Sequence, residues 1–216
     1  MRAFSNRAEA GRLLAEKLEK YAGRDDVIVL GLPRGGVPVA YEVARRLNVP
    51  LDVFIVRKLG APGFEELAVG AIASGGVRVL NDDVVRALPN ADEIIESVTA
   101  KETAELERRE QIYRDRRPAP DLRGRVVILV DDGLATGATM RAAVAALRQR
   151  DVGKIVIGVP VGAAETCREF EIEVDETICA IAPEWFQAVG QYYEDFSQTS
   201  DEEVRELLAR AAQGFS

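Results

Sequence analysis

Two adjacent carboxylates, Asp131 and Asp132, are the residues of this sequence whose types and spacing most clearly suit chemistry. They directly follow an apolar run, residues 126–130, in the stretch VVILVDDGLATGAT. Such a run predicts a buried strand, and two like charges at its end need partners. The small and hydroxyl-bearing residues 135–139 open a predicted helix, where backbone N–H groups and threonine hydroxyls can approach an anion. Carboxylates that accept from vicinal hydroxyls, beside a loop that holds a phosphate, suit a sugar phosphate.

The loop after the two carboxylates differs from the common nucleotide-binding loops. It contains no lysine, which excludes a Walker A loop, and the GxGxxG pattern occurs nowhere in the chain. An Asp-Asp pair alone at a strand end is more often a helix cap or a surface turn. The complete pattern of apolar strand, acidic pair and small-hydroxyl loop favours a binding site instead.

The same stretch resembles the signature of the type I phosphoribosyltransferases, which bind 5-phosphoribosyl-1-pyrophosphate (PRPP). The resemblance implies that Asp131 and Asp132 are catalytic, because in the family the acidic pair holds the ribose 2′- and 3′-hydroxyls and stabilises an oxocarbenium charge. Gly133 departs from the family pattern, where an aliphatic residue is more usual. The loop that would hold the 5′-phosphate consists of Ala135, Thr136, Gly137, Ala138 and Thr139.

A second glycine-containing loop, Leu32-Pro33-Arg34-Gly35-Gly36, follows an earlier predicted strand. It resembles the pyrophosphate loop of the family, in which a basic residue and glycines present backbone amides, often through a strained or cis peptide. The resemblance assigns Arg34, Gly35 and Gly36 to pyrophosphate binding. A plain strand–turn–helix connection is the alternative.

A third loop is predicted at Arg57 and Lys58, after a strand over residues 50–56. Family members often carry a cation here, or in the mobile loop beyond, that closes on pyrophosphate. We therefore expect Arg57 and Lys58 to bind pyrophosphate and residues 63–66 to belong to a mobile lid. A solvated basic pair at a turn is the alternative.

The acceptor base would lie under a hood, and the segment APEWFQAVGQYYEDF, residues 182–196, resembles the hood of the hypoxanthine-guanine enzymes. The resemblance implies that Trp185 or Phe186 stacks on the base. It also implies a Mg²⁺ site to which Glu194 and Asp195 contribute together with the acidic pair. Purine enzymes place a lysine on the preceding strand, but here only Lys154 occurs, at the strand start, so purine specificity is in doubt.

The elements that must position these residues alternate between strands and helices along the chain. This order predicts an α/β fold, with one parallel sheet flanked by helices, a small hood and a mobile lid or hairpin. We expect a single domain over residues 1–216, with the hood mainly at 171–200 and a helical insertion at about 82–117. A hairpin is predicted from residues 69–74 and 77–80, around Gly75-Gly76. The charged face of the insertion could support a homodimer.

Composition limits the function further. The chain has 216 residues, a net charge of −8 and no histidine, so a nucleic-acid partner and any histidine-dependent nucleophile are not expected. The first residues lack the apolar core of a signal peptide and no run approaches membrane-spanning length, so neither a signal peptide nor a membrane span is expected. Cys167 and Cys179 lie outside any CxxC, which predicts a reduced, cytoplasmic setting without a disulfide framework.

Three functions remain open from the sequence alone. The first is a Mg²⁺-dependent phosphoribosyltransferase that joins PRPP to a nitrogenous base and releases pyrophosphate. The second is a non-catalytic regulator of the same fold that senses PRPP or a nucleotide. The third makes the acidic pair a metal site for phosphate hydrolysis, but the further carboxylates that such a site needs are not found at other strand ends.

Overall fold

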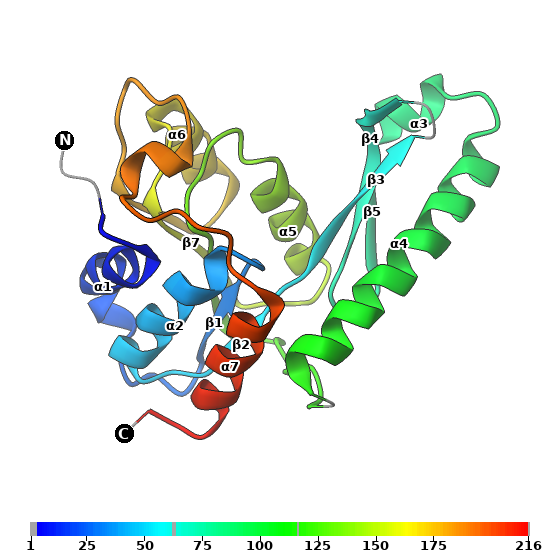
Figure 1. Ribbon diagram of the computed structural model, residues 1–216. Coiled ribbons are helices and arrows are strands. Elements are labelled where there is room, and N and C mark those ends of the chain that lie inside the picture. Colours follow the sequence, from blue (N-terminus) through cyan, green and yellow to red (C-terminus); the bar gives the residue numbers. More distant parts are fainter. Residues whose placement is uncertain (1–3, 62–63, 116, 216) are drawn as a thin grey trace.

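The computed structural model describes residues 4–61, 64–115 and 117–215 of the chain. Within them, a parallel five-stranded sheet lies at the centre (Figure 1), with the strand order β2-β1-β6-β7-β8. The strands are β1 (Val27–Gly31), β2 (Leu51–Val53), β6 (Val126–Val130), β7 (Lys154–Val161) and β8 (Glu176–Ile181). The predicted α/β fold with a parallel sheet is confirmed.

Helices cover both faces of this sheet because its strands direct apolar side chains alternately to two cores. On β6, Ile128 and Val130 belong to the core under α1 (Arg7–Lys17) and α2 (Gly36–Leu47). Val127 and Leu129 belong to the core under α5 (Ala138–Arg148) and α6 (Ala164–Glu173). All five residues of β1 and of β6 are buried. The end of β6, where the acidic pair begins, is therefore held rigidly in the middle of the sheet.

An arm projects from this body (Figure 1) and contains a second, antiparallel sheet in the order β3-β4-β5. Its elements are β3 (Val56–Ala61), β4 (Phe64–Ala73), β5 (Val77–Leu80), α3 (Asp82–Ala87) and α4 (Ala91–Arg114). The predicted hairpin is confirmed: Ala73 pairs with Val77, and Gly75 and Gly76 have φ of 82° and 76°. The helical insertion predicted at about 82–117 corresponds to α3 and α4.

The single strand predicted over residues 50–56 is wrong. After β2 ends, Phe54 N still donates to Gly31 O of the central sheet, but Ile55 N donates to the hydroxyl of Ser74 in the arm. From Val56 the chain pairs with β4. The apolar run therefore crosses from one sheet to another, and nothing in its hydrophobicity marks the crossing.

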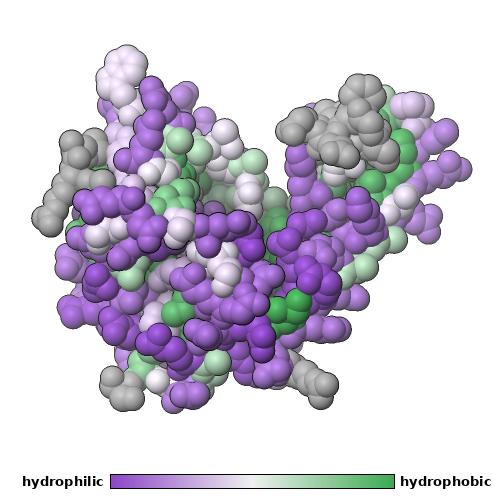
Figure 2. Space-filling view, viewed as in Figure 1, coloured by the Kyte–Doolittle hydropathy of each residue, from purple (hydrophilic) through white to green (hydrophobic). Residues whose placement is uncertain are grey.

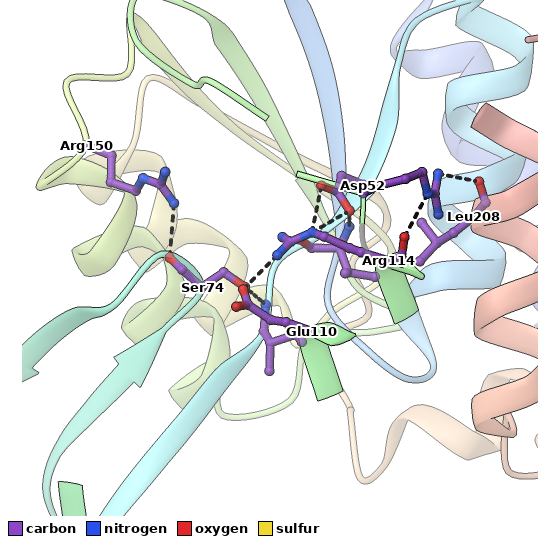
Figure 3. A network of polar contacts seen from close by, with 9 residues as sticks. Asp52, Ser74, Glu110, Arg114, Arg150 and Leu208 are labelled. Carbon is purple, nitrogen blue, oxygen red and sulfur yellow. Dashed lines mark hydrogen bonds and ion pairs between the residues drawn. The ribbon is translucent and has the colours of Figure 1, made fainter. Parts of the chain in front are cut away.

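Ion pairs and hydrogen bonds anchor the arm to the body (Figure 3). Arg114, 6% exposed at the end of α4, pairs with Asp52 of β2 at 3.1 Å and with Glu110 at 2.8 Å. On the other side, Arg150 donates to Ser74 O at 3.0 Å. Burial raises the pKa of Asp52, and the charge of Arg114 offsets part of that rise. The base of the arm is thus a network of charged contacts.

The C-terminal part of the described chain packs back onto the body. Residues 182–200 form an irregular segment that contains the 3₁₀ helix η2 (Val189–Tyr192), and α7 (Asp201–Ala212) follows it. Its Val204 and Leu208 join a core with Val37 of α2 and Tyr113 of α4. A second 3₁₀ helix, η1 (Glu19–Tyr21), follows α1.

The N-terminal end of the described chain pairs with this irregular segment. Phe4 and Tyr193 form a parallel β-bridge. Phe4 N donates to Tyr192 O, and Glu194 N donates to Phe4 O, both at 2.7 Å. The segment that resembles a hood is therefore tied to the N-terminal residues through the backbone.

Two expectations from the sequence, that no segment spans a membrane and that no disulfide forms, can be compared with the structure. Among the described residues, no helix has the length and apolar character needed to cross a bilayer. Cys167 of α6 and Cys179 of β8 form a disulfide, which contradicts the expectation that none is present. The reason is tertiary: α6 packs beside β8 and brings the two Cα atoms to 6.5 Å, within the range that a disulfide spans.

Candidate functional site

The acidic pair lies at the carboxyl end of β6, the edge of a parallel sheet where ligands usually bind. Asp132 N donates to Oδ1 of Asp131 at 2.8 Å, which orients the first carboxylate. Burial raises the pKa of Asp131 well above its usual range, and the negative charge of Asp132 adds to this. Burial also raises the pKa of Asp132, although Arg7 counteracts it. The site is thus short of positive charge.

The glycine loop after β1 packs directly on these carboxylates. A Cβ on Gly35 would lie 2.0 Å from Oδ2 of Asp132, and one on Gly36 would lie 2.7 Å from Val130 O. No side chain fits in either place, so both glycines are required by contact with the end of β6. The structure thus brings these two loops into contact, and the Pro33–Arg34 peptide within the glycine loop is cis.

The side chain of Arg34 is turned toward α7. Its Nη1 lies 3.9 Å from Oδ1 of Asp201, which also accepts a hydrogen bond of 2.6 Å from the hydroxyl of Tyr113. One third of the Arg34 side chain remains exposed. The arginine is therefore held at the edge of the site by a long, weak ion pair, from which it can turn toward an anion.

The loop 135–139 is fixed through its carbonyl groups. The hydroxyl of Thr166 donates to Ala135 O, and Arg141 donates to Thr136 O, both at 2.7 Å. Gly137 precedes α5 with φ of 74°, and a Cβ there would lie 2.7 Å from the ring of Phe170. The first N–H groups of a helix have no partner inside it, so those that open α5 are available to an anion.

The two cations predicted at the third loop lie inside β3, and the alternation of a strand sends them to opposite faces. Arg57 pairs with Glu102 of α4 at 2.6 Å, away from the acidic pair. Lys58 lines a cavity of about 360 Å³ together with Thr139 and Arg141. This cavity lies between the arm and α5, where Figure 2 shows a hollow bordered by hydrophobic residues.

The structure thus brings only one of those two cations, Lys58, to the side of the phosphate loop. The mobile lid was expected at residues 63–66. Gly63 lies outside the described residues, whereas the backbone of residues 64–66 belongs to β4.

The aromatic residues of the segment 182–196 take different positions. Trp185 is 93% exposed, whereas Phe186 stacks on Tyr192 with ring centroids 5.5 Å apart. The hydroxyl of Tyr193 donates to Asp132 O at 2.6 Å, so this segment reaches the acidic pair. Of the two residues predicted to stack on a base, Phe186 is the one packed within the segment.

Glu194 and Asp195, predicted to hold Mg²⁺ together with the acidic pair, lie at the exposed end of the segment 182–196. Asp195 accepts from the N–H of Ser197, which lowers the pKa of its carboxyl, and both residues are exposed. In the part of the chain that the structure describes, no three acidic, histidine or cysteine side chains gather to hold a metal ion. The four carboxylates are thus not preassembled as a metal site in these residues, and a role of Glu194 and Asp195 in binding Mg²⁺ stays a prediction.

The structure also explains why a glycine stands at position 133, where the family pattern more usually has an aliphatic residue. A Cβ at this position would lie 2.4 Å from Cγ1 of Val189 in η2. Val189 takes up the space beside residue 133, so a longer side chain in the loop would push the segment 182–196 away from the acidic pair.

Sequence reasoning missed Arg7, which lies at the centre of the site. Its Nε and Nη2 both lie 2.9 Å from Oδ2 of Asp132, and its Nη1 donates to Ser197 O at 2.7 Å. No local signal reveals this contact, because an arginine in the first turn of an amphipathic helix is ordinary and its partner is 125 residues away.

Comparisons with known proteins agree with this geometry. The provisionally named phosphoribosyl transferase Rv0571c of Mycobacterium tuberculosis is 48% identical over 216 residues, which is 100% of this chain and 48% of that protein. The bifunctional protein PyrR of Clostridium acetobutylicum is 29% identical over 147 residues, 67% of this chain and 62% of PyrR. The chain spans about half the length of the mycobacterial relative.

A solved structure is similar over nearly the whole chain. The crystal structure of TT1426 from Thermus thermophilus has a TM-score of 0.85 and 43% identity, and the match covers 97% of this chain and 99% of TT1426. The model of the phosphoribosyl transferase domain matches residues 5–197, which include every loop described above. The chain therefore belongs to the phosphoribosyl transferase domain family.

Proposed function

We propose that the protein transfers the 5-phosphoribosyl group of PRPP to a nitrogen atom of a base and releases pyrophosphate. The observation that carries this proposal is the direct contact between the acidic pair and Gly35 and Gly36, beside a phosphate loop at the start of α5. A donor with a phosphate, a ribose and a pyrophosphate needs three such groups at one edge of the sheet.

The proposed roles follow from the chemistry of each group. The N–H groups that open α5 and the hydroxyls of Thr136 and Thr139 bind the 5′-phosphate. Asp131 and Asp132 accept from the ribose hydroxyls. When the bond between C1 and pyrophosphate breaks, positive charge develops on the ribose ring, and the two carboxylates, whose charge Arg7 neutralises only in part, stabilise it.

The leaving pyrophosphate would lie against the glycine loop. Gly35 and Gly36 bring the backbone next to the acidic pair without side chains in the way. Arg34 can reach it from the edge of the site, and Lys58 can approach from the arm. Arg57 is not part of this proposal, because its guanidinium is engaged with Glu102.

The residues present fit a Mg²⁺ ion that arrives with the substrate. Mg²⁺ is commonly bound by one or two carboxylates together with substrate phosphates and waters, rather than by a cage of protein ligands. Asp131 and Asp132 can supply such carboxylates. The ion would neutralise charge on the pyrophosphate as it leaves, while the protein orients the ribose.

The acceptor is proposed only as a nitrogenous base. Phe186 and Tyr192 provide a stacked aromatic surface in the segment 182–196. Lys154 lies at the start of β7, where it bonds to Tyr21 and Glu176 at the opposite end of the sheet. It is therefore in no position to read the 6-oxo group of a purine.

The test is release of pyrophosphate from PRPP and Mg²⁺ in the presence of a panel of purine, pyrimidine and other nitrogen acceptors. We expect release that depends on one class of base. PRPP binding measured by calorimetry, without turnover for any base, would replace the enzyme with a PRPP sensor of the same fold. Absence of PRPP binding would refute both.

A further inference from the structure

Arg7 differs from the surface arginines of this chain in how completely its side chain is used. Two of its nitrogens contact the same oxygen of Asp132, the third donates to Ser197 O, and its Cζ lies 4.2 Å from the centre of the Phe196 ring. The side chain is only 12% exposed. A guanidinium fixed at all three nitrogens and stacked on a ring has one orientation.

The consequence for Asp132 is that its carboxylate cannot turn. Oδ2 is held by Arg7 on one side and faces the backbone of Gly35 on the other, while the hydroxyl of Tyr193 holds the main-chain carbonyl. In Asp131, Oδ1 accepts from the amide of Asp132. The oxygens that these bonds leave are Oδ1 of Asp132 and Oδ2 of Asp131, one on each of two neighbouring residues.

One oxygen on each carboxylate matches the need of two vicinal hydroxyls. If Asp132 were free to rotate, either of its oxygens could bind, and holding one orientation would cost conformational freedom at the moment of binding. Arg7 also leaves the acidic pair with a net negative charge, since one guanidinium faces two carboxylates. An ion pair that served stability alone would not need a second carboxylate, Asp131, next to Asp132.

Resting on the proposed function, we propose that Arg7 is a positioning residue for ribose. It fixes Asp132 so that the acidic pair presents one oxygen to each of the two ribose hydroxyls, with Oδ1 of Asp132 at the 2-hydroxyl. It acts through Asp132 and does not itself touch the substrate.

The experiment separates recognition of the hydroxyls from recognition of the phosphate. Calorimetry measures the affinities of ribose 5-phosphate and 2-deoxyribose 5-phosphate for the natural protein, Arg7→Gln, Arg7→Lys and Arg12→Gln. Arg12 lies on the same helix, is exposed and serves as the matched control. Thermal unfolding shows that each variant is folded.

We expect the natural protein and Arg12→Gln to prefer ribose 5-phosphate by at least about tenfold, because one charge-assisted hydrogen bond is lost with the deoxy sugar. In Arg7→Gln this preference should fall toward one, while the affinity for 2-deoxyribose 5-phosphate stays within about twofold because the loop at α5 is unchanged. Arg7→Lys keeps the charge but not the fork of donors, and should restore part of the preference.

The outcomes that overturn the inference differ from those that overturn the proposed function. A preference retained in Arg7→Gln, or an equal loss of affinity for both sugars, shows that Arg7 does not position Asp132 for ribose. If Arg7→Gln does not fold, a full natural preference in Arg7→Lys shows the same. If the natural protein binds neither sugar phosphate, or binds both equally, the ribose assignment of the acidic pair fails, and the inference fails with it.

Discussion

Both ends of the central sheet hold acidic groups, but the negative charge has several hydrogen-bonding partners at one end and few at the other. At the amino end, Glu176 accepts from Lys20 at 2.5 Å, from Tyr21 at 2.6 Å and from Lys154 at 3.2 Å. At the carboxyl end, the described residues offer Asp131 and Asp132 one shared cation, Arg7, at 2.9 Å from Asp132.

The pKa values express this difference. Burial favours a higher pKa for Glu176, but the hydrogen bonds from its three partners outweigh it and lower the pKa to about 2. For Asp131 and Asp132, burial outweighs the favourable contacts and the pKa values are raised. A carboxylate with a structural role is neutralised by cations and hydrogen-bond donors of the protein itself. A buried carboxylate with too few such partners indicates a place where a ligand binds.

The largest effect is expected from the double substitution of Asp131→Asn and Asp132→Asn. It removes two charge-assisted hydrogen bonds to ribose, each worth about 1.5–3 kcal/mol, so PRPP affinity should fall by at least about a hundredfold. Calorimetry with PRPP measures the loss. The fold should remain intact, because asparagine keeps the shape of each aspartate and an acceptor oxygen for Arg7.

An unchanged affinity in that double variant would mean that the acidic pair does not hold ribose. Glu176→Gln is the matched control, since it neutralises one carboxylate at the opposite end of the same sheet. It should leave PRPP affinity unchanged.

Glu176→Gln should instead reduce stability. A glutamine offers one acceptor oxygen in place of two and no charge to Lys20 and Lys154, so the free energy of unfolding should fall by about 1–2 kcal/mol. Urea unfolding at neutral pH measures this. Equal stability of the two proteins would show that the contacts at Glu176 are no stronger than those of a surface ion pair.

The stabilising contribution of Glu176 should also depend on pH. Because its pKa is lowered from 4.5 to about 2 in the folded protein, the contribution is fully present above pH 4.5. It is lost as the pH falls through that window toward 2. The difference in stability between the natural protein and Glu176→Gln should shrink over the same range.

The smallest effect is a gain in thermal stability, whereas the variants above lose affinity or stability. The raised pKa of Asp131 means that its ionised form costs stability at neutral pH, and the cost is relieved as the pH falls through the raised pKa. Asp131→Asn should therefore raise the melting temperature at neutral pH by roughly a few degrees. The gain should fade on acidification, and a loss of stability at neutral pH would contradict the assignment of an incomplete charge.

The parts of the site that could be predicted from sequence are those whose residues are contiguous in the chain. Strand β6, the acidic pair and the loop into α5 follow one another within residues 126–148, so their order alone places them at one edge of the sheet. The glycine loop was found by the same logic, but the contact that requires its glycines was not, because their neighbour Asp132 follows a different strand.

The parts that could not be predicted depend on contacts between distant segments. The pairing of Arg7 with Asp132, the disulfide between Cys167 and Cys179 and the pairing of Arg57 with Glu102 all follow from how separate elements pack together. The crossing from β2 to β3 was missed because apolar residues continue through it. Hydrophobic patterns report burial but not which sheet a residue joins.

The β-bridge between Phe4 and Tyr193 has a consequence for how the protein is made. The bridge and the bond from Arg7 to Ser197 join residues about 190 positions apart in the chain. During synthesis, the first helix leaves the ribosome long before its partners exist. The donor loops can assemble on the nascent sheet, but Arg7 reaches its final position only after the chain has emerged as far as Ser197.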